Sequence, residues 1–436
     1  MGAALSGSAT ATLKVAGISY AVVKLVKSGR LSEQTAEVLS KVSFQLCIPS
    51  LMLVQVATTV SRSPDVRMAA LPLLALVQIG VGAFAGSLGS RLVFRVQEAT
   101  EEEDGRARFA IASSASMAMG VPLATTALMK RPEQKPPPLL RQMTVLAAAF
   151  PNSMTVPLVL LSTLLGPAES ARAVGFLALF LLGWSPTLWS AGFSYLHGGD
   201  RGGAGAAGTG KSEPPEGVAA EKAAARVPPL WDGVSATVRR VLNPPLYGAI
   251  LGVAIGLVPH LADGILPGRA GPPLLATKPW EIQVLVGAVR SAMEVVEMLG
   301  KATLPMQAIV LAASMALSKQ LSGPAGEAVR LLPADRYERG IFLVSSVVRL
   351  VISPLVGLAS VLACRHFGWL PADRICHFVV ATISAMPSAQ NMVLLLNLRD
   401  NTREAAPMMS SIILRQYVLS AVVSTVWVGV FACVFM

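Results

Sequence analysis

The sequence contains few charged residues and few aromatic ones. Charged residues make up 14% of its 436 residues, and Phe, Trp and Tyr together make up 6%, whereas roughly a quarter of the residues of a soluble domain are charged. This scarcity excludes a water-soluble enzyme. Hydrophobic residues make up 53% of the chain, and they gather in blocks of about 20 to 30 residues, each long enough to cross roughly 30 Å of hydrocarbon as a helix. The sequence therefore predicts an all-α polytopic membrane protein.

Cysteine and histidine are also scarce, with four of each, and no cysteines form a CxxC pair. Cys47, Cys364, Cys376 and Cys433 lie in or beside apolar blocks, and no histidine cluster lies near them. We expect buried thiols without a metal or disulfide role, and no cofactor. No set of nucleophile, base and orienting residue emerges either, so an enzyme is the least expected class.

The formal net charge is +11. The basic residues lie between the apolar blocks rather than on one face, so we expect no nucleic-acid partner. Their position is typical of residues that orient helices in a membrane. The N-terminus lacks the basic start and small-residue cleavage site of a secretory signal peptide.

The apolar blocks predict about ten transmembrane helices. They lie at 8–27, 38–60, 69–96, 142–165, 171–196, 243–265, 282–317, 341–363, 374–398 and 408–436. Segment 107–129 is ambiguous, because it is long enough to span but only weakly apolar. If only the ten blocks span, most loop Lys and Arg residues fall in the odd-numbered loops, and the bias is weaker if 107–129 also spans. The positive-inside rule therefore favours ten spans with both termini on the lumenal or exterior side, and 107–129 as an interfacial or re-entrant insert.

The longest loop, 197–241, is rich in Gly, Ala and Pro and predicts a flexible cytosolic linker. Within it, GAAGTGKS at 205–212 satisfies the phosphate-loop pattern G-x-x-x-x-G-K-[ST]. No apolar strand precedes this stretch, and EPPEG follows it instead of an amphipathic helix. We interpret it as a chance match in a Gly-rich linker.

Two proline motifs recur in the two halves of the chain, in the same order. Pro49 and Pro305 each follow a stretch with an acidic residue, then a basic residue, then apolar residues. Pro151 and Pro387 each lie where polar residues interrupt an apolar block. Extra residues lie between the motifs of the first half, which fits 107–129 as an insertion. Five helices per half is an odd number, so the second copy must enter the membrane from the opposite side. This predicts an inverted repeat, with a first repeat at 1–196 carrying an insert near 97–141, and a second at 242–436.

The interruptions at Pro151 and Pro387 are the predicted functional site. Proline removes a backbone donor and disturbs the helix, and such a break is tolerated in a membrane only where it is buried in protein or lines a polar cavity. The half-helix after each break is expected to point its amides at a carboxylate. The alternative is a pair of proline kinks whose polar side chains satisfy neighbouring backbone. The polar residues beside the breaks are Asn152, Ser153, Thr155, Ser388, Gln390 and Asn391.

Ionisable residues inside a span are functional candidates because they are costly in lipid. Arg290, Glu294, Glu297 and Lys301 share one face of the seventh block as neighbouring opposite charges. They indicate an internal ladder of ion pairs or, alternatively, a carboxylate for proton coupling. Arg349 lies within the eighth block with no carboxylate at helical spacing around it. It balances an anionic substrate or bonds backbone carbonyls.

Six stretches follow one another along the chain: FQLCIPSLML (44–53), FPNSMTVPLVLL (150–161), NPPLYGAILGVAIGLVP (243–259), LPMQAIVLAASMAL (304–317), VVRLVISPLVGLA (347–359) and MPSAQNMVLL (386–395). In this order they resemble the auxin efflux carrier family, particularly its PIN-LIKES branch. The resemblance implies ten helices in two inverted repeats, with helices 4 and 9 broken and crossing near their prolines. It also implies transport of indole-3-acetic acid or a similar organic anion. The first crossover departs from the PIN-LIKES pattern, since P-N-S stands where that branch has G-N-x-G-N.

The leading hypothesis is a carrier of small organic anions that works by alternating access. The alternatives are a sodium-coupled anion symporter and a membrane receptor that binds a ligand without moving it. The expected partners are the anion and the lipid bilayer, a homodimer is left open, and the resemblance favours the endoplasmic reticulum over the plasma membrane. The predicted substrate-binding residues are Pro151, Asn152, Ser153, Pro387, Ser388, Gln390, Asn391 and Arg349.

Overall fold

The computed structural model is helical throughout the residues that it describes. These residues are 20–22, 24–26, 28–62, 65–119, 138–197, 244–267, 280–303, 305–307, 309–310, 312–313, 332–333, 335–397 and 400–436. The longer helices are α2 (Glu33–Val42), α3 (Ile48–Arg62), α4 (Ala70–Met119), α5 (Pro138–Ala149), α6 (Thr155–Leu164), α7 (Pro167–Thr187), α10 (Pro244–Gly256), α12 (Trp280–Lys301), α14 (Arg336–Val347), α15 (Ser353–His366), α16 (Arg374–Ser384) and α19 (Ala406–Phe435). The shorter ones are α8 (Phe193–His197), α11 (Pro259–Ile265), α17 (Asn391–Asn397) and α18 (Asp400–Arg403), with the 3-10 turn η2 (Val66–Ala69).

Five unbroken segments of the described chain are long and apolar enough to cross a membrane. They match the second, third, fifth, eighth and tenth predicted blocks: Val38–Arg62, Val66–Val96, Pro167–Leu196, Arg336–His366 and Ala406–Phe435. The sixth block is α10 followed by α11, bent by 112°, and counts as a sixth candidate if the pair is one span. The fourth and ninth blocks are each interrupted, as α5 and α6 and as α16 and α17. Most of the first block and of the 197–241 loop lies outside the described residues.

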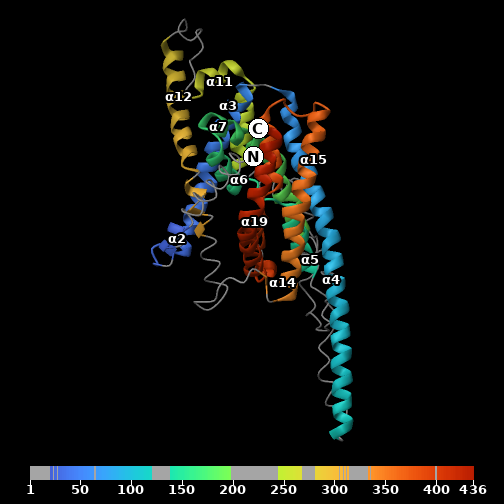
Figure 1. The fold of residues 1–436 in the computed structure, drawn as a ribbon. Coiled ribbons are helices and arrows are strands. Elements are labelled where there is room, and N and C mark those ends of the chain that lie inside the picture. The colour runs from blue at the N-terminus through green and yellow to red at the C-terminus, as the bar shows by residue number, and fades with distance from the viewer. Residues whose placement is uncertain are drawn as a thin grey trace, which may run out of the picture.

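The long helix α4 differs from the prediction. It continues without a break from the third block to Met119, and its far end runs well beyond the other helices (Figure 1). At 1.5 Å per residue, its 50 residues extend over about 75 Å. No proline interrupts residues 97–119, so nothing in the sequence ends the helix there. Residues 107–119 are therefore not the separate re-entrant insert that the sequence predicted, and 120–129 lie outside the described chain.

Three of the spans contain a π-helical turn, which widens the helix locally. These turns are η1 (Ser43–Cys47), η5 (Leu188–Gly192) and η8 (Val348–Ile352). Such turns are rare and often lie at functional sites. Each of the three carries a residue of the site described below, namely Phe44, Trp189 or Arg349.

Close packing of α10 on α3 organises one group of helices, which we call the α3 group and which also includes α12. Gly248, Gly252 and Gly256 recur at every fourth position of α10 and face α3. A β-carbon at Gly248 would lie 2.2 Å from the carbonyl oxygen of Pro49, so only glycine allows this approach. Small residues at this spacing are a common way to bring membrane helices together.

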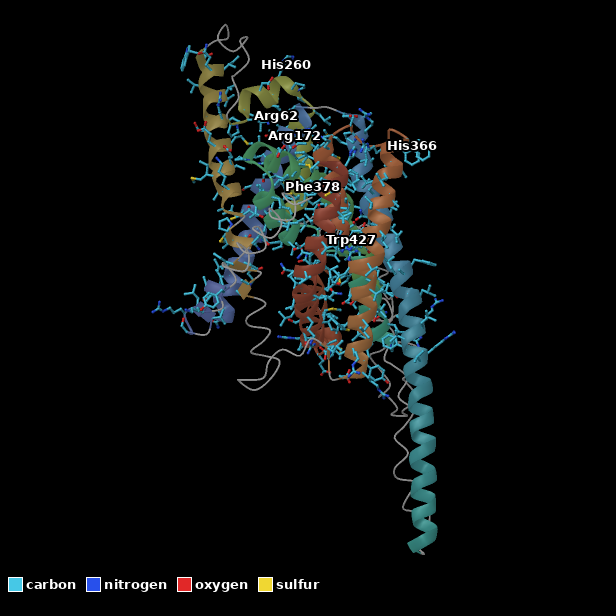
Figure 2. The ribbon with its side chains drawn as sticks, viewed as in Figure 1. Arg62, Arg172, His260, His366, Phe378 and Trp427 are labelled. Carbon is cyan, nitrogen blue, oxygen red and sulfur yellow. The ribbon has the colours of Figure 1, made fainter. Side chains whose placement is uncertain are left out.

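The remaining helices lie around the two interrupted spans, and we call them the crossover group, which also packs on α3 and α10 through α7. In it α4 packs on α5 and α7, α14 packs on α5, and α16 packs on α7, α15 and α19. The indole Nε1 of Trp427 in α19 donates to the carbonyl of Leu350 in η8 over 2.9 Å, and Figure 2 shows this tryptophan in the middle of the group. At one end, Arg172 of α7 pairs with Asp373, whose carboxylate also caps α16. Figure 1 shows α12 on the opposite side of the molecule from the long α4.

Candidate functional site

The two interrupted spans meet at their breaks. Pro151 and Ser388 lie opposite each other as an isolated antiparallel bridge. The amide of Asn152 donates to the carbonyl of Pro387 over 2.7 Å, and the amide of Ala389 donates to the carbonyl of Phe150 over 2.9 Å. Each break therefore satisfies some backbone hydrogen-bonding groups of the other, which is needed because no water is available to bond them inside a membrane.

Asn152 holds the first break in shape. Its Oδ1 accepts from the amide of Thr155 over 2.9 Å and from that of Met154 over 3.3 Å, and so caps the start of α6. Its Nδ2 donates to the hydroxyl of Tyr417 in α19. Because Asn152 already occupies these amides, the prediction that the first turn of α6 offers them to a carboxylate is wrong for this conformation.

Ser388 holds the second break and is completely buried. Its amide donates to Gln416 Oε1 over 3.0 Å, and its hydroxyl donates to the carbonyl of Ala147 over 2.6 Å. Gln416 in turn donates to the hydroxyl of Ser345 over 2.9 Å. These bonds connect the break to α5, α14 and α19, which indicates that Ser388 supports the crossing rather than facing a ligand.

Arg349 is 0% exposed and bonds the backbone beside the second break. Its Nε donates to the carbonyl of Met386 over 3.1 Å, and its Nη2 donates to the carbonyl of Ser384 over 3.2 Å. Its Nη1 reaches the hydroxyl of Ser353. A cation at the C-terminal end of a helix is also favoured by the helix dipole. The sequence left open whether Arg349 balances an anionic substrate or bonds backbone carbonyls. In the structure its guanidinium bonds backbone carbonyls.

A partly open cavity lies beside the crossing, and residues of both the crossover group and the α3 group line it. Four of the predicted site residues line it: Asn152, Ser153, Gln390 and Asn391. The other four, Pro151, Pro387, Ser388 and Arg349, are not among its lining residues. The structure thus separates residues that shape the crossing from residues that a ligand can reach.

Uncharged donors and acceptors gather at one end of this cavity. The hydroxyl of Thr155 donates to Gln307 Oε1 over 2.9 Å, and Gln390 Nε2 lies 3.4 Å from the same hydroxyl. Ser153 donates to the nearby carbonyl of Pro151 over 3.2 Å. The side chain of Asn391 makes no hydrogen bond to a described residue, although it lines the cavity. Hydroxyl and amide groups are therefore available to a polar ligand group at this end.

The rest of the cavity is apolar and partly aromatic. Trp184 and Trp189 of the fifth span line it together with Phe44, Ile48 and Met52 of the second span. Trp184 also contacts Phe150 edge to face, with 5.9 Å between the ring centroids. A mostly apolar pocket with a few polar groups at one end is the usual composition of a small-molecule site. This one suits a ligand with a flat apolar body and one polar end.

Comparison with known proteins identifies the class of protein that carries this site. A model of the family described as "Membrane transport protein" matches residues 126–428, which is more than half of the chain. The chain belongs to this family, which is the auxin efflux carrier family. It is thus a multi-pass membrane transporter and not a member of an enzyme family.

Two curated relatives of this transporter are proteins of Arabidopsis thaliana. Protein PIN-LIKES 7 is 24% identical over 43% of this chain and 39% of its own length. Protein PIN-LIKES 5 is 24% identical over 44% of this chain and 40% of its own length. The matched region therefore spans about two fifths of these relatives.

Two lining residues of the transporter, Gln307 and Trp184, were not predicted from the sequence. Gln307 follows Pro305 by two residues, and Trp184 precedes Pro186 by two. Both prolines stand inside apolar blocks. A polar or large aromatic residue close to such a proline was the sequence signal that could have identified them as lining residues.

The charged face of α12 lies away from the cavity. Lys301 pairs with Glu297 over 3.1 Å with a largely exposed ammonium group, so this part of the predicted ion-pair ladder is confirmed. Glu294 is exposed, and neither carboxylate lines the cavity. The alternative of a coupling carboxylate on this helix gains no support from the geometry.

Proposed function

We propose that this transporter carries a small organic anion, of the auxin-like carboxylate type, through the cavity at the crossed breaks. The observation that carries the proposal is the composition of that cavity. It combines amide and hydroxyl groups at the crossing with an aromatic and apolar wall. Indole-3-acetic acid has this shape, with one carboxylate and one flat apolar ring system.

The substrate carboxylate is held by Asn391, Gln390, Ser153 and Thr155. Hydrogen bonds to a charged acceptor are about twice as strong as neutral ones, so uncharged donors suffice for a carboxylate without a buried counter-charge. Asn152 acts indirectly, because its side chain is committed to the cap of α6 and to Tyr417. The indole or similar ring lies against Trp184 and the apolar residues of the second span.

Transport proceeds by alternating access, in which the crossover group moves relative to the α3 group. The cavity is lined from both groups, so a relative displacement changes which side of the membrane it faces. We propose that the groups arise from two inverted repeats, 1–196 and 242–436, joined by the 197–241 linker. The matching breaks at Pro151 and Pro387 and their antiparallel contact support this proposal.

Transport does not require sodium. In many secondary transporters the carbonyls at the C-terminal end of a broken half-helix coordinate sodium. Here the carbonyls of Ser384 and Met386 already accept hydrogen bonds from Arg349. The guanidinium supplies a fixed positive charge where a coupled cation would otherwise bind. This argues against the sodium symporter among the sequence alternatives.

We place the transporter in the endoplasmic reticulum, because its sequence resembles the PIN-LIKES branch and its predicted cytosolic loop is short. Fluorescence microscopy of the tagged full chain with markers for the endoplasmic reticulum and the plasma membrane tests this placement. Signal confined to the plasma membrane would contradict it.

The function is tested with purified protein in proteoliposomes. We expect uptake of a radiolabelled carboxylate from a panel of indole and other organic acids, with competition by the unlabelled acid. A receptor, the remaining alternative, would give ligand-dependent thermal stabilisation without flux. Absence of both flux and stabilisation over the whole panel would contradict an organic-anion site.

A further inference from the structure

Gln307 connects the two groups of helices at the polar end of the cavity. It follows α12, and its Nε2 donates to the hydroxyl of Ser43 in η1 over 2.7 Å. Its Oε1 accepts from the hydroxyl of Thr155, the first residue of α6, over 2.9 Å. Gln307 is 5% exposed and Thr155 is 4% exposed. A buried hydrogen bond therefore joins the α3 group to the first break.

The bond to Ser43 fixes the orientation of the Gln307 amide. With Nε2 engaged by Ser43, Oε1 points toward Thr155 and presents a carbonyl oxygen to the cavity donors. Gln390 Nε2 lies 3.4 Å from the same Thr155 hydroxyl, and Asn391 lines the adjacent wall. A protein oxygen, Gln307 Oε1, thus accepts the hydrogen bond of the Thr155 hydroxyl beside the cavity residues Gln390 and Asn391.

We propose that Gln307 Oε1 holds the place of one carboxylate oxygen of the substrate, and that the substrate displaces it. We call the Thr155–Gln307 hydrogen bond the latch. The inference rests on the proposed function, since it needs a carboxylate at the crossing. When the substrate binds, its carboxylate accepts the hydrogen bond from the Thr155 hydroxyl. Gln307 keeps its hydrogen bond to Ser43 in η1.

The exchange of acceptors is favourable because of charge. A hydroxyl bonded to a carboxylate makes a bond roughly twice as strong as one to a neutral amide. The substrate can therefore break the latch, whereas an uncharged ligand of the same shape gains little over Gln307. Gln307 therefore determines specificity, because its Oε1 competes for the Thr155 hydroxyl and a ligand with a weak acceptor cannot displace it.

The latch also predicts how the empty carrier behaves. The latch adds to the packing of α7 on α3 and α10, so the crossover group moves more slowly without substrate, when the latch is closed. With substrate bound, the latch is open and movement is faster. Exchange of substrate across the membrane should consequently be faster than net transport into empty vesicles, because exchange never requires the empty carrier to move.

The test compares two substitutions that open the latch from opposite sides. Thr155→Val removes the donor that both Gln307 and the substrate use, so we expect a KM several-fold higher. Gln307→Leu removes the competing acceptor and the bond to Ser43 but keeps the Thr155 donor, so we expect an unchanged or lower KM. In both variants the ratio of exchange to net transport should fall toward one. Thr155→Ser keeps the hydroxyl and should restore both values.

Thr163→Val is the matched control on the same half-helix. Among the described residues, its hydroxyl bonds only the carbonyls of Val159 and Leu160 within α6, and it is not among the residues that line the cavity. We expect this variant to keep the wild-type KM and the wild-type ratio. If Gln307→Leu reduces the amount of folded protein, Gln307→Met provides a longer unbranched replacement for the same measurements.

The latch is overturned if Thr155→Val and Gln307→Leu raise KM alike and leave the ratio unchanged while the wild-type protein transports carboxylates. That result would leave the proposed function intact and assign the bond a purely structural role. Absence of carboxylate flux in the wild-type protein would overturn the proposed function and the latch together.

Discussion

Asn152 and Asn391 each follow a break in a membrane span, but their side chains are held differently. Asn152 caps α6 and bonds Tyr417, whereas Asn391 faces the cavity without a hydrogen bond to the described residues. The same residue type therefore supports the fold at one break and faces the cavity at the other. From the sequence, both residues were predicted to bind the substrate.

Asn391→Ala is expected to raise KM about tenfold, because a hydrogen bond to a charged group contributes about 1.5 to 3 kcal/mol. Its thermal unfolding should stay close to that of the wild-type protein. Asn152→Ala should instead lower the unfolding temperature, because the cap of α6 is lost. Radiolabel flux and thermal unfolding in detergent check both variants. Equal effects of the two substitutions on both readouts would contradict this division of roles.

Arg349→Met should destabilise the protein by on the order of 3 kcal/mol, because it leaves the buried carbonyls of Ser384 and Met386 without their donor. Thermal unfolding measures the effect. An unchanged unfolding temperature with lost substrate binding would instead show that Arg349 acts as the counter-charge of the substrate.

At the scale of the helices, glycine contacts set how closely α10 approaches α3. Gly248→Ala would place a β-carbon 2.2 Å from the carbonyl oxygen of Pro49, so one helix must move. We expect a clearly lower unfolding temperature for this variant. Gly287→Ala in α12 is the matched control, because no atom of the part of the chain that the structure describes lies within 4 Å of its added carbon. Equal stability of the two variants would show that the approach is not limited by glycine.

Proline made the breaks at Pro151 and Pro387 predictable, since each interrupts an apolar block with polar residues. The π-helical turns were not predictable in this way, because η8 and its neighbours carry ordinary apolar residues around Arg349. The continuation of α4 was missed because a fall in hydropathy does not end a helix. Gln307 was missed because its importance depends on Ser43 and Thr155, which are distant in sequence.

At the scale of the whole molecule, the charge pattern and the apolar blocks predicted a membrane protein, and the family shows a membrane transporter. The cavity is lined from both the α3 group and the crossover group, which also pack on each other through α7. Sequence spacing alone does not reveal this arrangement, because it arises from contacts between helices far apart along the chain. In the proposed alternating-access mechanism, a displacement of one group against the other changes the side of the membrane that the cavity faces.

Replacing sodium by choline should leave the rate of transport unchanged, because Arg349 already bonds the carbonyls beside the second break. The measurement is initial uptake by proteoliposomes at equal ionic strength and membrane potential. A loss of uptake in choline, restored by sodium, would show a coupled cation site elsewhere in the chain.

The most direct measurement of the central claim is uptake of radiolabelled indole-3-acetic acid by proteoliposomes containing the wild-type protein or Asn391→Ala. Thr163→Val serves as the control, because its hydroxyl bonds only within α6. The account predicts saturable uptake by the wild-type and control proteins and uptake reduced about tenfold at low substrate concentration for Asn391→Ala, consistent with one lost charge-assisted bond. Full uptake by Asn391→Ala, with normal amounts of folded protein, would contradict a substrate site at the crossed breaks.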